Sequence, residues 1–387
     1  MKMEYRLEEI YDLQMGKTPS RNNLDYWNTT DNKWISIADL SKCGKYIENT
    51  KEYLSNQAVE ESGISQIPAN TVVMSFKLSI GKTAITSEPM YSNEAIMSFR
   101  DKMVTDILPD YIYYLFFNRD WSEGTNKAVM GKTLNKATLS KIKVNIPDMK
   151  SQQKVVEVLD KVNNIIDARK SELKELNKLI KARFVEMFGD PVTNSYELPE
   201  ATLPELGEFG RGVSKHRPRN DPRLLGGEYP LVQTGDVANT SLYIMSYNST
   251  YSELGLKQSK MWSKGTLCIT IAANIAKTAI LEFDACFPDS VVGFIANEKT
   301  NNIFIHYWFS FFQAILESQA PESAQKNINL KILSELKVIV PEKEKQNEFV
   351  DFVHQVDKSK VAVQINKDII QELLIIYIFI VNKYCYK

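Results

Sequence analysis

The sequence is poor in the residues that most often bind metals or form disulfides. Its three histidines are far apart, and its four cysteines include no Cys-x-x-Cys pair. The cysteines are Cys43, Cys268, Cys286 and Cys385. These spacings argue against a zinc site and against a disulfide framework, and they fit a reducing cytoplasm. We therefore expect no metal in this chain.

The sequence also lacks a long apolar run and a strong excess of charge of either sign. The apolar run Leu373–Val381 has nine residues, whereas a membrane-spanning helix needs about 20. The first residues show no signal-peptide pattern, so we expect a cytoplasmic protein without a membrane anchor. Because the formal net charge is −1, binding to nucleic acid would have to depend on local clusters of charge.

Catalytic motifs are missing as well. Three Gly-Lys-Thr tripeptides begin at Gly16, Gly81 and Gly131, but none has the preceding glycine that a phosphate-binding loop requires. The sequence contains no Gly-x-Gly-x-x-Gly loop and no tetrapeptide typical of amino-methyltransferases. A self-sufficient nuclease or methyltransferase is therefore disfavoured, and the chain is not expected to be catalytic alone.

What the sequence does contain is an internal repeat. Residues 139–147 (LSKIKVNIP) recur as residues 333–341 (LSELKVIVP), at an offset of 194 residues, and Gln152 falls opposite Gln346. The tetrapeptide Lys82–Ile85 recurs at Lys277–Ile280, one residue out of phase. This period is far longer than the roughly 20–50 residues of a solenoid repeat. It predicts two copies of a whole domain, each with a connecting segment.

Each copy has the pattern of an α+β domain followed by a long helix. Short aromatic and β-branched runs separated by turn residues predict strands in residues 1–150 and 191–341, and residues 110–118 predict a buried helix. Residues 152–188 carry a heptad pattern, with Ser151 as the expected N-cap and Gly189-Asp190-Pro191 as the stop. A second helix is expected from about residue 342. The expected segments are therefore 1–150, 151–190, 191–341 and 342–387.

The heptad pattern has two interpretations. Each helix could lie on its own globule, or the two helices could pair antiparallel as a coiled coil that separates the globules, which the length and regularity favour. The expected seam residues are Val155, Leu159, Val162, Ile166, Leu173, Leu176, Ile180, Val353, Val356, Val363 and Ile370. From Leu374 onward the second helix departs from the repeat and becomes an atypical apolar tail.

Basic residues recur at matched places in the two copies. Residues 124–147 and 211–219 contain several basic residues and no acidic one, a composition that suits phosphate contacts and recognition of base edges by arginine. The alternative is a set of solvated loops, but the repetition favours a shared polyanionic partner. The candidate DNA-binding residues are Lys17, Arg21, Lys82, Lys132, Lys136, Arg211, Lys215, Arg217, Arg219, Lys277 and Lys326.

The order of these motifs resembles that of the specificity subunits of type I restriction-modification enzymes. The resemblance covers essentially the whole chain. It rests on the loops Gly16–Arg21 and Ser79–Lys82, the repeated strand that leads into a glutamine-containing helix start, and the segment Arg183–Pro191. No single motif decides it, but their order and duplication are specific.

The resemblance implies a non-catalytic protein that binds a bipartite DNA sequence. Each globule would be a target recognition domain, and the paired helices would set the spacer and dock two modification subunits. S-adenosylmethionine, ATP and Mg²⁺ would act on the modification and restriction subunits, with no cofactor in this chain. The alternative from another class is a coiled-coil adaptor that joins proteins without recognising DNA.

Overall fold

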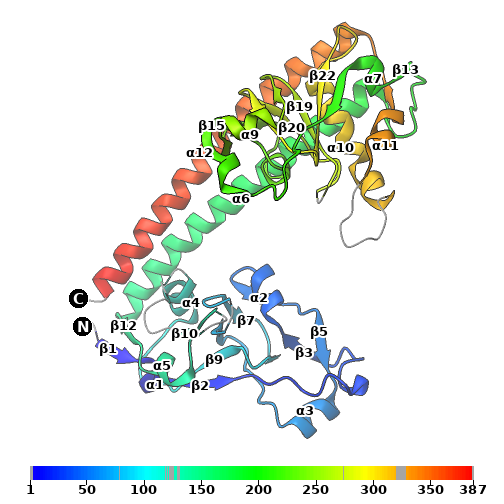
Figure 1. Ribbon diagram of the computed structural model, residues 1–387. Helices are drawn as coiled ribbons and strands as arrows, with labels where there is room; N and C mark the ends of the chain where they lie inside the picture. The colour runs from blue at the N-terminus through cyan, green and yellow to red at the C-terminus, as the bar shows by residue number, and fades with distance from the viewer. Residues whose placement is uncertain are drawn as a thin grey trace. The chain divides into compact units, whose positions relative to one another are not determined.

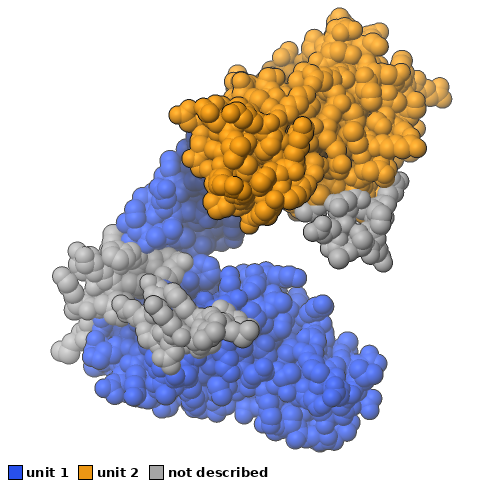
Figure 2. Space-filling view, in the orientation of Figure 1, with its two compact units in different colours: residues 1–170, 364–387 blue, residues 171–363 orange. Residues whose placement is uncertain are grey.

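The chain divides into two compact units that share two long helices. The computed structural model describes residues 3–77, 79–117, 119, 121, 126–128, 131–272, 274–319 and 328–385. Unit 1 comprises residues 1–170 and 364–387, and unit 2 comprises residues 171–363 (Figure 2). Within the described part of the chain, no helix combines the length and apolar character needed to cross a membrane.

Unit 1 is built around a five-stranded sheet with the order β2-β9-β6-β7-β4 (Figure 1). These strands are β2 (Tyr11–Met15), β9 (Ile96–Asp101), β6 (Val72–Ser75), β7 (Thr83–Thr86) and β4 (Tyr46–Ile47). The smaller sheets are β5 (Glu52–Leu54) with β3 (Asn32–Ile35) and β8 (Tyr91–Ser92), β1 (Met3–Arg6) with β12 (Lys143–Ile146), and β10 (Asn126–Ala128) with β11 (Gly131–Thr133). The short helices are α1 (Leu7–Ile10), α2 (Ile37–Lys42), α3 (Asn56–Ser62), α4 (Pro109–Phe117) and α5 (Lys136–Ser140).

Unit 2 contains a five-stranded sheet of the same design, in the order β14-β22-β19-β20-β16. These strands are β14 (Gly207–Arg211), β22 (Val291–Ala296), β19 (Leu267–Thr270), β20 (Thr278–Leu281) and β16 (Tyr243–Ile244). The other sheets are β17 (Ser249–Tyr251) with β15 (Leu225–Leu231), β21 (Ala285–Cys286) and β18 (Met261–Trp262), and β13 (Glu200–Thr202) with β23 (Lys337–Ile339). The short helices are α7 (Leu203–Leu206), α8 (Thr234–Ala238), α9 (Glu253–Lys257) and α11 (Leu330–Glu335), and the longer helix α10 covers Asn302–Gln319.

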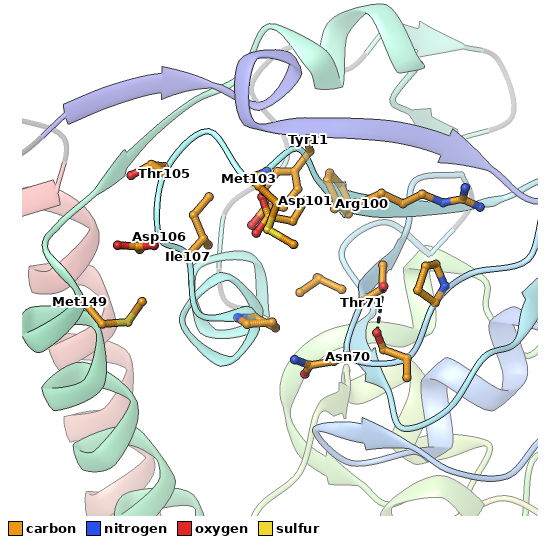
Figure 3. Close-up of a pocket in the computed structure, with 15 residues that line it drawn as sticks. Tyr11, Asn70, Thr71, Arg100, Asp101, Met103, Thr105, Asp106, Ile107 and Met149 are labelled. Carbon is orange, nitrogen blue, oxygen red and sulfur yellow. Dashed lines mark hydrogen bonds between the residues drawn. The ribbon is translucent and has the colours of Figure 1, made fainter.

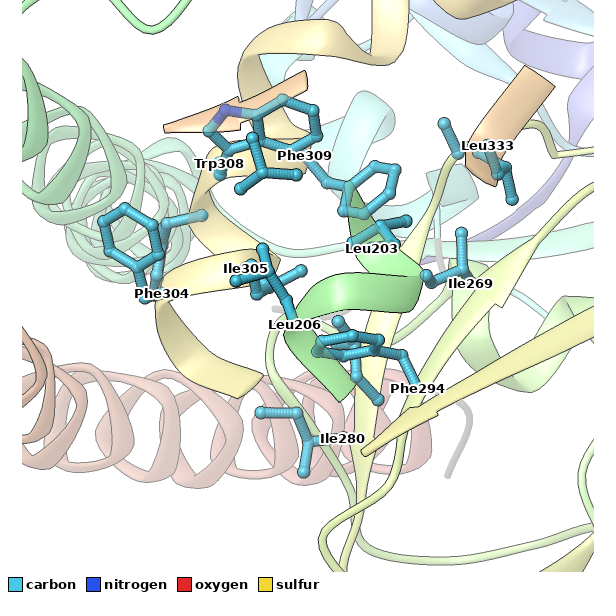
Figure 4. Packing of buried hydrophobic residues seen from close by; sticks show 14 of the residues in the cluster. Leu203, Leu206, Ile269, Ile280, Phe294, Phe304, Ile305, Trp308, Phe309 and Leu333 are labelled. Carbon is cyan, nitrogen blue, oxygen red and sulfur yellow. The ribbon is translucent and has the colours of Figure 1, made fainter. Parts of the chain in front are cut away.

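The two sheets match strand for strand, which confirms the predicted duplication. In each sheet the first four strands are antiparallel neighbours, and the last pair, β4 with β7 or β16 with β20, is parallel. The predicted helix at residues 110–118 is α4, and six of its nine residues are buried. In unit 2, α7 and α10 pack their apolar side chains against strands β19 and β22 (Figure 4).

The long helices are α6 (Met149–Phe188) and α12 (Lys343–Cys385). With 40 residues, α6 is about 60 Å long at 1.5 Å per residue. The expectation that Ser151 caps α6 is wrong, because its amide lies inside the first turn and donates to Asp148 Oδ1 at 3.0 Å. The expected stop is confirmed: Gly189 has a φ of +75°, a conformation that favours glycine.

The two helices pair in opposite directions, as each unit shows by itself. In unit 1, Leu159 and Ile166 from the first half of α6 share a core with Leu374 from the last part of α12. In unit 2, Ile180 from the second half of α6 shares a core with Val353 from the first part of α12. Both cores also include sheet residues, so the helices lie on their globules and pair with each other at once.

The expected seam is largely inside these cores. Its buried members are Leu159, Ile166, Ile180, Val353, Val356 and Val363, and its half-buried members are Val155, Val162, Leu173, Leu176 and Ile370. Beyond Ile180 the buried residues are Phe184 and Phe188, which follow steps of four rather than the heptad. A straight helix of 3.6 residues per turn drifts away from a strict heptad in this way.

A charged cluster ties the edge strand β4 of unit 1 to α6. Lys45 forms ion pairs with Asp110 and with Asp160, the latter at 2.8 Å. Tyr46 donates a hydrogen bond to Asp110 at 2.6 Å, and Tyr114 donates one to Asp160. Burial alone would raise the pKa of Asp110, but the hydrogen bonds from Lys45 and Tyr46 outweigh it and hold the pKa below its usual value.

Candidate nucleic-acid interface

Each unit has a polar loop that begins at a glycine after the first strand of its main sheet. The Gly16 amide donates to Ile96 O at 3.2 Å, and the Gly212 amide donates to Val291 O at 2.8 Å. A Cβ on Gly16 would lie 2.1 Å from Ser92 O, and one on Gly212 would lie 2.3 Å from Phe287 O. Only glycine fits such close backbone contacts, so both loops leave their sheets in the same way.

In unit 1 this loop presents Lys17 and Arg21, two of the predicted site residues. The Arg21 guanidinium lies 3.7 Å from the ring centroid of Trp27 and forms an ion pair with Glu52. The Lys17 ammonium donates to the backbone carbonyl of Ser62 at the end of α3. Cation–π stacking and the carboxylate together fix the plane of the Arg21 guanidinium while it stays about half exposed. The sequence did not reveal this arrangement, because Glu52 comes from a separate strand.

In unit 2, Arg211 ends strand β14, and the loop that begins at Gly212 carries three more predicted residues, Lys215, Arg217 and Arg219. Arg217 and Arg219 both form ion pairs with Asp289, and Arg217 Nη1 also donates to Ser214 O at 2.6 Å. The hydrogen bonds from Arg223 hold the pKa of Asp221 well below its usual range, so this neighbouring carboxylate stays ionised.

A hollow of about 270 Å³ lies beside Arg219. Its polar lining includes Asn220, Gln233, Thr234 and Ser290. Amide, hydroxyl and guanidinium groups of this kind offer the donors and acceptors that recognise base edges. Sequence reasoning missed all of these residues except Arg219, because they come from separate segments that carry no shared motif.

Lys82 lies between strands β6 and β7, and its counterpart Lys277 lies between β19 and β20. The two lysines have equivalent backbone contacts, but their side chains lie in different surroundings. The Lys82 amide donates to Ser75 Oγ, and the Lys277 amide donates to Thr270 Oγ1, both at 3.1 Å. The Lys82 side chain is exposed, whereas Lys277 Nζ donates to Gln313 Oε1 of α10 at 3.2 Å. Lys277 is therefore held against its own globule and is a weaker candidate for contact with a partner.

The remaining candidates are not gathered with these loops. Lys136 borders a groove with Glu8 and Asp12, near the start of β2, whereas Lys17 follows the end of that strand. Only the backbone of Lys132 is described, and Lys326 lies outside the described residues.

A second hollow, of about 480 Å³ beside the unit 1 sheet, is not lined by these loops (Figure 3). Its polar lining includes Tyr11, Arg100, Asp101 and Asp106. Arg100 Nη2 donates to Gln66 O. Burial, with the charge of Asp101, raises the pKa of Tyr11, so this phenol stays neutral. The described residues around this hollow form no nucleophile–base pair.

Comparison with known families decides what this duplicated fold is. The model of the type I restriction modification DNA specificity domain matches the chain twice, at residues 2–178 and 200–374. The chain belongs to this type I specificity family. Each match covers one copy of the sheet and most of the long helix that follows it.

Individual members of the specificity family are distant in sequence. The chain is 28% identical over 190 residues to the type I restriction enzyme MjaIX specificity subunit of Methanocaldococcus jannaschii, covering 48% of this chain and 43% of the relative. It is 26% identical over 170 residues to the EcoR124I/EcoR124II specificity subunit of Escherichia coli, covering 42% and 41%. Each match thus spans less than half the length of either relative.

The fold of the specificity family extends over the whole chain. A chain from a structural study of complex assembly and conformational transition of the type I R-M system matches with a TM-score of 0.61 at 14% identity, covering 97% of this chain and 96% of that one. The S subunit of the type I system from M. genitalium matches with a TM-score of 0.52 at 13% identity, covering 98% and 95%. At these identities the likeness concerns the fold.

Proposed function

We propose that this protein is the non-catalytic specificity subunit of a type I restriction-modification enzyme. In this role it binds a bipartite DNA sequence, with one half-site for each globule, and it carries the modification and restriction subunits. The observation that carries the proposal is the pair of matched loops that follow Gly16 and Gly212. Their backbones leave the sheets in the same way, while their side chains differ.

The contacts within these loops suit an exchange of partners on DNA. Arg21 is paired with Glu52, and Arg217 and Arg219 are paired with Asp289. Exposed ion pairs of this type contribute about 0–1 kcal/mol, so a phosphate or a guanine edge can replace the carboxylate at little cost. Before DNA binds, the carboxylates keep the guanidinium groups ordered, which lowers the conformational entropy lost on binding.

The paired helices supply the spacer and a place for a protein partner. In unit 1 they border an almost wholly apolar groove of about 410 Å³, lined by residues that include Val158, Ile165, Leu373 and Ile376. Ile165, Leu373 and Ile376 are between 43% and 58% exposed, which is typical of a surface that a partner covers. We assign this groove to a modification subunit. S-adenosylmethionine, ATP and Mg²⁺ then act on the partner subunits.

A direct test compares two substitutions in unit 2 that each remove one positive charge. We expect Arg219→Gln, in the complex with modification subunits, to weaken DNA binding and to relax selectivity in one half-site. Loss of a bidentate contact to a base costs about 1–3 kcal/mol. Lys331→Gln on α11 is the control, because the Lys331 side chain is 78% exposed and lies outside the loop.

The same measurement separates the DNA-binding role from that of a protein adaptor. Binding of duplex DNA that falls steeply with salt concentration supports the proposal, since each phosphate contact releases counterions. If the complex assembles but binds DNA weakly and independently of salt, and Arg219→Gln behaves like Lys331→Gln, the chain is an adaptor.

A further inference from the structure

One glutamine at the start of each long helix is fully buried, and both the nitrogen and the oxygen of its side-chain amide are hydrogen-bonded. Gln152 Nε2 donates to Pro147 O and to Asp106 O, both at 2.9 Å. Its Oε1 accepts a hydrogen bond from the Leu108 amide at 2.9 Å. Gln152 is 0% exposed. A single side chain therefore joins the first turn of α6, the exit of strand β12 and the loop that leads from β9 into α4.

The second copy repeats the arrangement with different neighbours. Gln346 Nε2 donates to Pro341 O at 2.8 Å and to Lys299 O at 2.9 Å. Its Oε1 accepts from Thr300 Oγ1 at 3.0 Å, and Gln346 is also 0% exposed. The segments joined are again the helix start, the exit of the last strand and the loop between the sheet and the aromatic helix α10. The acceptor role of the amide oxygen is kept, although its donor changes from a backbone amide to a hydroxyl.

These contacts act at the one place where each globule passes covalently into its long helix. The apolar contacts between globule and helix are not directional and tolerate small rotations. Three hydrogen bonds from one rigid amide do not, because their strength falls steeply with angle. Loss of the amide would also leave buried backbone groups without partners, which is costly.

We propose that Gln152 and Gln346 are positioning residues that fix the orientation of each globule on its helix. This inference rests on the proposed function: the orientation of each globule determines which length of spacer between the half-sites the enzyme accepts. One added base pair moves a half-site by about 3.4 Å along the duplex. A globule that can rotate at its helix start would tolerate such a change.

The first measurement tests the orientation without DNA. In full-length protein, Cys43 and Cys385 are replaced by serine, and cysteines that carry spin labels are introduced at Lys51 and Asn164. The labels report the distance between the globule formed by residues 1–147 and helix α6. We expect Gln152→Met, which keeps the size and loses the amide, to broaden this distance distribution. Gln153→Met is the matched control, because Gln153 is the exposed neighbour. An unchanged distribution in Gln152→Met overturns the proposal.

The second measurement tests the consequence for specificity. Complexes with modification subunits are assayed for methylation of DNA with the native spacer and with spacers one base pair shorter or longer. In Gln152→Met and Gln346→Met, the rate on altered spacers relative to the native spacer is expected to rise about ten-fold, the change that corresponds to about 1.4 kcal/mol of lost discrimination. Gln153→Met and Asn347→Met should leave this ratio unchanged.

The two measurements distinguish the possible failures. A residue that only stabilises the fold would lower all rates together and leave the ratio unchanged, and that result overturns the link to the spacer. If the unaltered complex shows no preference for a spacer, the proposed function fails, while the label distances still decide the positioning role. Gln152→Asn, whose amide is one methylene too short, provides a second variant if Gln152→Met does not fold.

Discussion

The aromatic cluster that anchors α6 in unit 2 gives a quantitative prediction. Phe184 is 0% exposed, and its ring centroid lies 5.0 Å from that of Phe188, 5.3 Å from Phe304, 5.2 Å from Phe311 and 5.3 Å from Phe349. Phe184→Ala removes four ring contacts and leaves a cavity that rigid neighbours cannot fill. Such changes destabilise by about 3–5 kcal/mol.

This loss should appear as a large fall in the melting temperature of unit 2. One kcal/mol lowers the melting temperature of a domain of 150–250 residues by about 2–4 °C, so Phe184→Ala should lower it by roughly 6–20 °C. Thermal unfolding of the full-length chain, with hydrogen exchange used to resolve the two units, measures the shift. Leu179→Ala is the control, because Leu179 lies on the same helix and is 48% exposed. It should change the free energy of unfolding by no more than about 0.5 kcal/mol. Equal shifts for both variants would refute the packing argument.

Three further changes test other parts of the structure. Burial lowers the pKa of His306 to about 4 from its ordinary value of about 6.5, so the unfolded chain binds a proton more readily than the folded chain does. We therefore expect unit 2 to lose up to about 3 kcal/mol of stability as the pH falls from 6.5 to 4. Chemical unfolding measures this loss, and the variant His306→Gln should remove most of the pH dependence. Gly16→Ala forces a Cβ to within 2.1 Å of a carbonyl oxygen and should cost about 1–3 kcal/mol, whereas Gly44→Ala, with open space around it, should not. Lys45→Met leaves Asp160 without its ion pair and should destabilise unit 1 by about 1–2 kcal/mol, since the pair is only partly buried; an unchanged melting temperature for unit 1 would contradict this.

The sequence predicted the parts of this fold that depend on periodic or repeated patterns. The repeat at residues 139–147 and 333–341, the two long helices and the helix at residues 110–118 all follow from local patterns. The prediction failed where one turn of helix decides between alternatives. Asp148 rather than Ser151 caps α6, and Phe184 and Phe188 rather than the heptad positions are buried at its end.

The candidate site was less predictable, because its geometry comes from contacts between distant segments. The basic residues of the two loops could be selected from composition alone: Lys17, Arg21, Arg217 and Arg219. Their partners could not, since Arg217 and Arg219 meet a carboxylate about 70 residues away, at Asp289, and no motif marks such pairs. Whether these side chains contact DNA stays a prediction.

The central claim, that each globule recognises one half of a split DNA sequence, is tested most directly by exchanging one globule. Residues 1–147 would be replaced by the corresponding segment of another member of the family, and the methylated motif would be determined by methylome sequencing of cells that carry the complete system. We predict that one half of the motif changes, while the other half and the spacer stay the same. A motif that changes in both halves, or in neither, would contradict the account.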